Sequence, residues 1–79
     1  MITESEISRY LRAALPDAEV TAIDTTGTRD HWRVEVVSGL FAGRNLLDRH
    51  RLIQKALADP MGDGRIHALE IAANAPDGQ

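Results

Sequence analysis

The side chains of this sequence best suited to chemistry are its three histidines, His31, His50 and His67. An imidazole can ligate a metal, transfer a proton or hydrogen-bond within a core. There is no cysteine, which excludes disulfides, thiolate metal sites and cysteine catalysis by this chain alone. The sequence also lacks a Ser-His-Asp spacing, a paired-carboxylate constellation and an H-E-x-x-H motif, so we do not expect an enzyme.

The first half of the chain predicts a helix and a hairpin. Thr3-Glu4-Ser5-Glu6 is typical of a capping box, and the helix after it ends before Pro16. Its apolar stripe comprises Ile7, Tyr10, Leu11, Ala14 and Leu15. Two strands, over residues 18–24 and 31–37, flank an exposed loop of turn-forming residues. His31 therefore lies where this loop becomes a strand.

The second half predicts a turn, a second helix and a last strand. Phe41 packs inward, and Gly43 permits a backbone angle closed to other residues. The apolar stripe of the helix comprises Leu46, Leu47, His50, Ile53, Ala56 and Leu57. Asp59-Pro60 closes this helix, residues 61–64 form a loop, and the last strand spans residues 65–73. On strand alternation alone, His67 shares the core-facing side of that strand with Leu69 and Ile71.

These elements define an α+β fold with the order α-β-β-α-β. A strand–helix–strand connection is normally a right-handed parallel crossover, so the second and third strands should be parallel neighbours. We expect a three-stranded mixed sheet with both helices on one face. Parallel neighbours begin at the same end of a sheet, so His31 and His67 should lie close together beside the loop of residues 25–30.

Several motifs together resemble the BolA family over nearly the whole chain. They are Phe41-Ala42-Gly43, then His50-Arg51 with Ala56-Leu57, and finally Ile66-His67-Ala68-Leu69. The resemblance implies a fold like the type II KH domain. Many relatives carry a Gly-Ser-His loop, whereas this sequence has Thr28-Arg29-Asp30-His31, which places a carboxylate beside the histidine.

The resemblance also implies a function. BolA-like proteins are partners of monothiol glutaredoxins in sharing a bridging [2Fe–2S] cluster, in cluster trafficking and in iron homeostasis. The family's cluster-ligating histidine corresponds to His67, and its second proposed ligand to His31. The remaining ligands would be a partner thiolate and glutathione, so no cluster is expected on the isolated chain. Phe41, Gly43 and His50 match the structural part of the family motif.

Each histidine also has a structural interpretation. His67 could be a core-edge residue hydrogen-bonded to the backbone, and His31 a solvated loop residue. His50 lies on an apolar stripe, so we interpret it as structural, bonded to a backbone carbonyl or a capping group.

A basic group on the second helix supports an alternative function. Its members are Arg44, Arg49, Arg51 and Lys55. Three interpretations are open: a solvated helix face, a docking surface for the glutaredoxin, or a surface that contacts phosphates. The last possibility makes the chain a KH-like, DNA-binding transcriptional regulator. Gly39 and Gly43 are separated by three residues, so they do not form the GxxG loop with which KH domains clamp nucleic acid.

The bulk properties set the remaining expectations. Seventy-nine residues suggest one domain, residues 1–79, with residues 74–79 as a frayed tail. The net charge of -3 argues against a general polyanion binder. No apolar run approaches the roughly 20 residues of a membrane span. We expect a cytoplasmic protein without a membrane partner that is a monomer or weak homodimer in its apo form.

Overall fold

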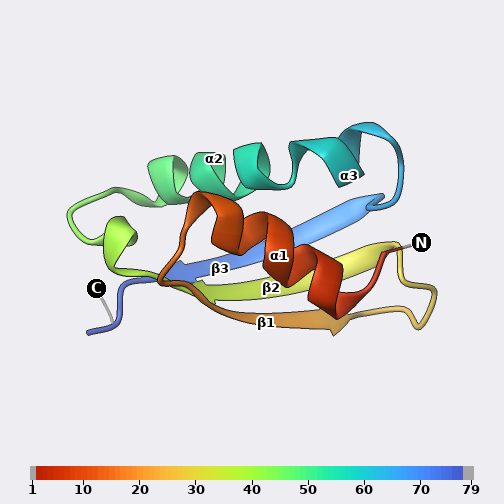
Figure 1. The fold of residues 1–79 in the computed structure, drawn as a ribbon, viewed down its shortest axis with the longest axis horizontal. Coiled ribbons are helices and arrows are strands. Elements are labelled where there is room, and N and C mark those ends of the chain that lie inside the picture. The colour runs from red at the N-terminus through yellow and green to blue at the C-terminus, as the bar shows by residue number, and fades with distance from the viewer. Residues whose placement is uncertain (1, 78–79) are drawn as a thin grey trace.

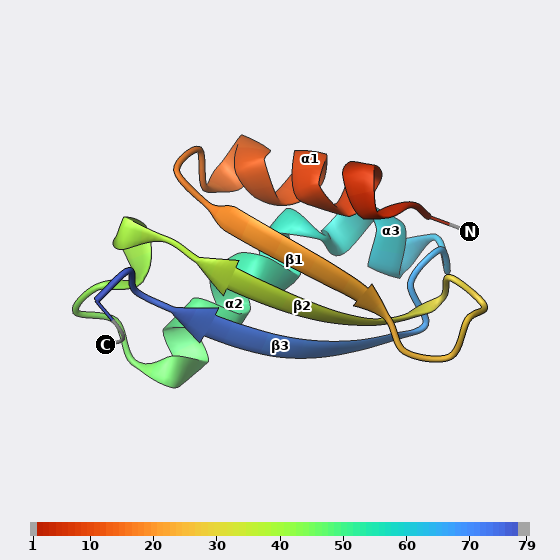
Figure 2. The same cartoon turned by 90° about the horizontal axis from the view of Figure 1, so that it is seen from below.

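Residues 2–77, which the computed structural model describes, form one sheet with the helices on a single face (Figure 1, Figure 2). The elements in chain order are α1 Glu4–Ala14, β1 Glu19–Asp24, β2 His31–Val37, a 3-10 turn Gly39–Phe41, α2 Leu46–Ala56, α3 Ala58–Gly62 and β3 Ala68–Asn74. The predicted α+β class is confirmed. No helix among the described residues is both long and apolar enough to cross a membrane.

The sheet has the order β1-β2-β3. β1 and β2 pair antiparallel, whereas β2 and β3 pair parallel, as the crossover rule predicted. Along β2, Trp32, Val34 and Val36 are buried beneath the helices, and the alternate residues are only half-buried. This strict alternation fixes the register, because a one-residue slip would turn the apolar side chains to the open face.

The capping box at the start of α1 is present as predicted. The Thr3 hydroxyl accepts the Glu6 N–H at 3.2 Å, and the Glu6 carboxylate accepts the Thr3 N–H at the same distance. Ile7 and Leu11 are fully buried, so α1 lies on the sheet through its apolar stripe. Ala14 is exposed, contrary to prediction, because it lies at the flank of that stripe.

The turn after β2 is held by Asp17, which precedes β1 and lies at the same end of the sheet, because Glu19 of β1 pairs with Val37 of β2. The Asp17 carboxylate accepts the Ser38 hydroxyl at 2.6 Å and the Gly39 N–H at 2.7 Å. These two hydrogen bonds, the first more than the second, lower the pKa of Asp17. Phe41 then enters the core with no exposed surface, and Gly43 adopts φ 76°, so both predictions for the turn are confirmed.

Two predictions about the second helix are wrong. Leu46 and Leu47 are 64% and 58% exposed, because the first turn of α2 lies at the end of the molecule where the sheet stops (Figure 1). Pro60 does not end the helical region but lies in the first turn of α3, where no N–H is needed for an intrahelical hydrogen bond. Residues 61 and 62, predicted as loop, belong to α3.

The bounds of the last strand also differ from prediction. β3 begins at Ala68 rather than at residue 65, so His67 precedes the strand and the predicted alternation does not apply to it. Asn74 belongs to β3 and Ala75 is only 2% exposed, so the predicted frayed tail is wrong at these two positions. Its last two residues, 78 and 79, lie outside the described residues.

Candidate functional site

The parallel pairing of β2 and β3 brings His31 and His67 together, as predicted. His31 is the first residue of β2 and is paired with Ala68, so His67 lies one residue before this register. The two imidazole ring centroids are 6.2 Å apart, and the ring planes are nearly perpendicular at 84°. Both histidines lie at the end of the sheet where the loop between β1 and β2 is found (Figure 1).

A single carboxylate connects the two rings. Asp30 Oδ1 lies 2.8 Å from Nδ1 of His31, and Asp30 Oδ2 lies 3.2 Å from Nδ1 of His67. The Thr28 hydroxyl donates a further hydrogen bond to Asp30 Oδ1. The Thr28 bond and then the His31 bond hold the pKa of Asp30 down to about 2, so this carboxylate is ionised at neutral pH. The sequence suggested the neighbour relation to His31, but the contact with His67 depends on the fold.

The backbone of Asp30 is held as firmly as its side chain. Its carbonyl oxygen accepts the His67 N–H at 2.7 Å and the Ala68 N–H at 3.3 Å, which joins the loop to the start of β3. On the other side of the loop, the Asp24 carboxylate accepts three backbone N–H groups, those of Thr26, Gly27 and Arg29. The loop is therefore a hydrogen-bonded unit.

The histidine side chains are accessible, whereas the carboxylate between them is more covered. The exposed fractions are 42% for His31, 59% for His67 and 25% for Asp30. The interpretation of His67 as a core-edge residue is wrong, because the side chain lies before the strand and in solvent. Exposed imidazoles of this kind can act as metal ligands. Among residues 2–77, no group of three or more His, Cys, Asp or Glu side chains is placed to hold a metal ion.

Arg65 supports the segment that leads to His67. Its guanidinium is bonded to the Asp63 carboxylate at 2.9 Å and donates to the Tyr10 hydroxyl at 3.0 Å. The same group lies 5.6 Å from the centre of the Tyr10 ring, which adds a cation–π contact to α1. The hydrogen bond to Tyr10 is the main cause of the raised pKa of Arg65. No spacing in the sequence indicated this link between α1 and the loop before β3.

The third histidine lies apart from this pair. His50 is half-buried on α2, as are its neighbours Asp48 and Arg49. The expected hydrogen bond from its ring to a backbone or capping group is not found among residues 2–77.

The four basic residues near α2 divide into two pairs. Arg44 donates from Nε to the carbonyl of Leu40 at 3.0 Å. Arg49 donates from Nε to the Arg44 carbonyl at 3.0 Å and from Nη1 to the Ala73 carbonyl of β3 at 3.2 Å. These two arginines hold the backbone together. Arg51 and Lys55 are exposed, and they are the part of this group that a partner could contact.

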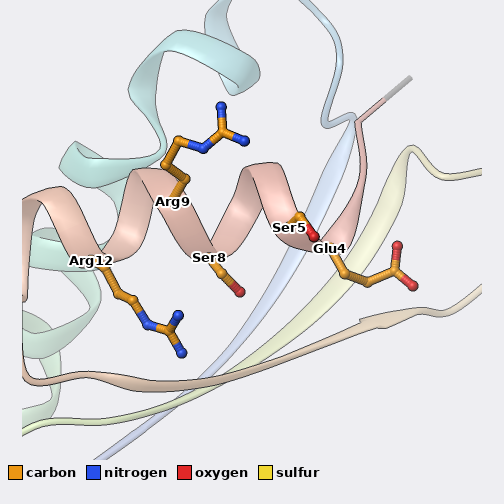
Figure 3. A pocket seen from close by; sticks show the side chains of 5 residues that line it. All are labelled: Glu4, Ser5, Ser8, Arg9 and Arg12. Carbon is orange, nitrogen blue, oxygen red and sulfur yellow. The ribbon is translucent and has the colours of Figure 1, made fainter.

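One hollow of the described surface lies on α1, away from the histidines. It has a volume of about 470 Å³ and is lined by Glu4, Ser5, Ser8, Arg9 and Arg12, all from α1 (Figure 3). In Figure 3 the Arg9 and Arg12 side chains extend to opposite sides of the helix, and Arg12 donates to the Ala18 carbonyl. Because these polar groups do not converge, we do not interpret the hollow as a binding site.

The fold and the site together define a small α+β domain that presents a carboxylate-bridged histidine pair at one end of its sheet. Residues 11–78 match the sequence profile of the BolA family, described as "BolA-like protein". The chain belongs to this family.

Individual relatives agree with this assignment. Protein BOLA2 of Arabidopsis thaliana is 38% identical over 72 residues, which cover 90% of this chain and 75% of the relative. Human BolA-like protein 1 is 50% identical over 50 residues, which cover 63% of this chain and 36% of the human protein. The matched part is thus about a third of the human relative's length.

Solved structures of the family share the fold. BolA1 from Arabidopsis thaliana superposes with a TM-score of 0.84 at 30% identity, covering 95% of this chain and 93% of that one. A bolA protein homologue from Coxiella burnetii gives 0.81 at 31% identity, covering 98% and 95%.

Proposed function

We propose that this BolA-like protein binds a monothiol glutaredoxin and shares a bridging [2Fe–2S] cluster with it, in cluster trafficking or iron homeostasis. Its role is that of an interaction and relay protein rather than an enzyme. The observation that carries the proposal is the exposed pair His31 and His67, whose ring centroids are 6.2 Å apart in a chain with no cysteine.

The donor set of the site suits this role. His67 would be the principal ligand and His31 the second, because His67 is the more exposed of the two at 59%. Histidine ligation of a [2Fe–2S] iron is established chemistry and raises its reduction potential relative to ligation by thiolates alone. Since this chain has no cysteine, thiolate ligands would have to come from the glutaredoxin and from glutathione.

The exposed cations on α2 are candidates for docking the partner. Arg51 and Lys55 are free of the backbone bonds that hold Arg44 and Arg49, so they can contact an acidic surface. The alternative function, DNA binding by this helix, draws less support. Two of the four basic residues in and before this helix, Arg44 and Arg49, already bond to the backbone, and the net charge of the chain is -3.

The test is to mix the apo protein with a cluster-loaded monothiol glutaredoxin and to record the visible absorption and circular dichroism spectra. The wild-type protein should change both spectra, and His67→Ala should abolish most of the change. His50→Ala is the matched control, since it removes an imidazole from α2 and should leave the change intact. A wild-type spectral change from His67→Ala would contradict the ligand assignment. No complex with the wild-type protein would contradict the function.

A further inference from the structure

The Asp30 carboxylate contacts both candidate ligands, and in each imidazole ring the contacted atom is Nδ1. Its two carboxylate oxygens lie against the two Nδ1 atoms, at 2.8 Å for His31 and 3.2 Å for His67. We propose that Asp30 is a positioning residue that fixes both histidines as their Nδ1–H tautomers and thereby reserves each Nε2 as the ligand nitrogen. This inference rests on the proposed function, because it concerns the same histidines.

The tautomer follows from what each group can donate. An ionised carboxylate has no proton to give, so it only accepts hydrogen bonds. Nδ1 of His31 is hydrogen-bonded to Asp30 Oδ1 and must therefore supply the proton of that bond. Nδ1 of His67 lies at ion-pair distance, 3.2 Å from Oδ2, where a bare nitrogen would place its lone pair against the carboxylate, so the proton is favoured on this Nδ1 too. A neutral imidazole carries one N–H, so its second nitrogen, Nε2, keeps a free lone pair. In metalloproteins a carboxylate on the far nitrogen of a ligating histidine orients the ring and raises its basicity.

Asp30 is suited to this task because its own position is fixed. Its backbone carbonyl accepts the N–H groups of His67 and Ala68, so the residue is tied to the start of β3 independently of its side chain. At 25% exposure, its carboxylate is the most covered of the three side chains. One short, anchored side chain thus controls two rings that are otherwise largely in solvent.

Gly64 lies beside the Nε2 of His67. A β-carbon built at Gly64 would lie 3.8 Å from that nitrogen, which is ordinary contact distance. Gly64 also has φ +84°, a conformation that residues with a side chain rarely adopt. The side of His67 that faces away from Asp30 is therefore bordered at this point by a residue without a side chain.

Asp30→Asn tests the proposal with almost no change of shape. The amide has one oxygen and one NH₂ group, so it can accept from one Nδ1–H but must donate to the other ring. The ring that accepts from the amide then carries its proton on Nε2, where it blocks ligation. The backbone bonds from Asp30 to β3 do not depend on the substitution, and Trp32 fluorescence will confirm that the variant folds. Asp48→Asn, in the first turn of α2, makes the same charge change at the other end of the molecule.

The first measurement uses the apo protein alone. Long-range proton–nitrogen NMR correlations at about pH 8.5, where imidazoles are neutral, distinguish protonated from unprotonated ring nitrogens. In the wild type and in Asp48→Asn, both His31 and His67 should be protonated at Nδ1. In Asp30→Asn, one of the two should be protonated at Nε2. Nε2 protonation of either ring in the wild type, or unchanged tautomers in Asp30→Asn, would overturn the proposal.

The second measurement adds a cluster-loaded monothiol glutaredoxin. Asp30→Asn should weaken the affinity for it about 10- to 100-fold, the usual effect of losing an outer partner of a ligating histidine. The reduction potential of the complex that still forms should rise, because the rings become weaker donors. A purely structural role of Asp30 would not move this potential. Wild-type affinity and potential in Asp30→Asn would contradict the inference but not the proposed function. If the wild-type protein formed no complex, the proposed function would be wrong, and the tautomers would be decided by the NMR measurement alone.

Discussion

Arg49 belongs to the basic motif of α2, yet its contacts indicate that it stabilises the fold. Its guanidinium joins the carbonyl of Arg44 to that of Ala73 in β3, and the second of these bonds is partly buried. A hydrogen bond to a charged group contributes about 1.5–3 kcal/mol. We therefore expect Arg49→Ala to lower the free energy of unfolding by about 2 kcal/mol.

This loss is large for a chain of this size. A stability of about 0.05–0.15 kcal/mol per residue gives about 4–12 kcal/mol for the whole domain. The melting temperature should fall by about 8–16 °C, at about 4–8 °C per kcal/mol. Urea unfolding can be followed by the fluorescence of Trp32, the single tryptophan, which is 1% exposed in the folded state.

Two variants serve as controls for Arg49→Ala. Arg51→Ala removes the same charge from the same helix at an exposed position, and its stability should stay within about 0.5 kcal/mol of wild type. Arg49→Lys should fall between the two, because one ammonium group cannot reproduce the fork that reaches both carbonyls. Equal losses for Arg49→Ala and Arg51→Ala would refute the structural role of Arg49.

The remaining predictions concern the turn after β2. Phe41→Ala should lower the free energy of unfolding by about 3–5 kcal/mol, since the ring has no exposed surface, and a loss below about 2 kcal/mol in urea would contradict this placement. The pKa of Asp17 is lower in the folded than in the unfolded protein, so its contribution is present above about pH 4 and is lost as the pH falls further. Asp17→Asn should reduce the drop in urea midpoint between pH 6 and pH 3, and an unchanged drop would show that Asp17 is not responsible.

Arg49 also shows how a test of DNA binding must be designed. Charge reversal at this position would break its two backbone bonds, so a loss of DNA binding could reflect unfolding. Arg51 and Lys55 are exposed and can be reversed without that complication. The sequence could not separate these residues, because all of them are cations at similar helical spacing. The carbonyl that binds Arg49 comes from a strand 24 residues away.

The sequence predicted the fold well where local signals and packing agree. The capping box at Thr3 is a local motif, and the alternation of Trp32, Val34 and Val36 has a period of two residues; the structure confirms both. The prediction of buried residues failed where burial depends on whether another element packs against the helix. Leu46 and Leu47 have the spacing of a packed stripe, but the sheet ends before it can cover them. Pro60 has the chemistry of a helix end, but a new helix begins just before it.

In the candidate site, the order of the elements along the chain was predictable from the sequence, whereas one side-chain contact was not. The juxtaposition of His31 and His67 follows from connectivity alone, since parallel neighbours start at one end of a sheet. The role of Asp30 does not follow from connectivity, because it depends on the conformation of the loop. That conformation places the Asp30 carboxylate against both imidazole rings, which are 36 residues apart in sequence. What the sequence offered was only the position of an acid next to a histidine.

The location of the pair at the strand starts explains why the site can be altered separately from the core. Both imidazoles and the Asp30 carboxylate lie outside the buried cluster, whereas the backbone of Asp30 is what joins the loop to β3. We therefore expect side-chain changes at these three positions to leave the ladder between β2 and β3 in place. A loss of partner or cluster binding in such variants can be assigned to the lost side chain rather than to a weakened fold.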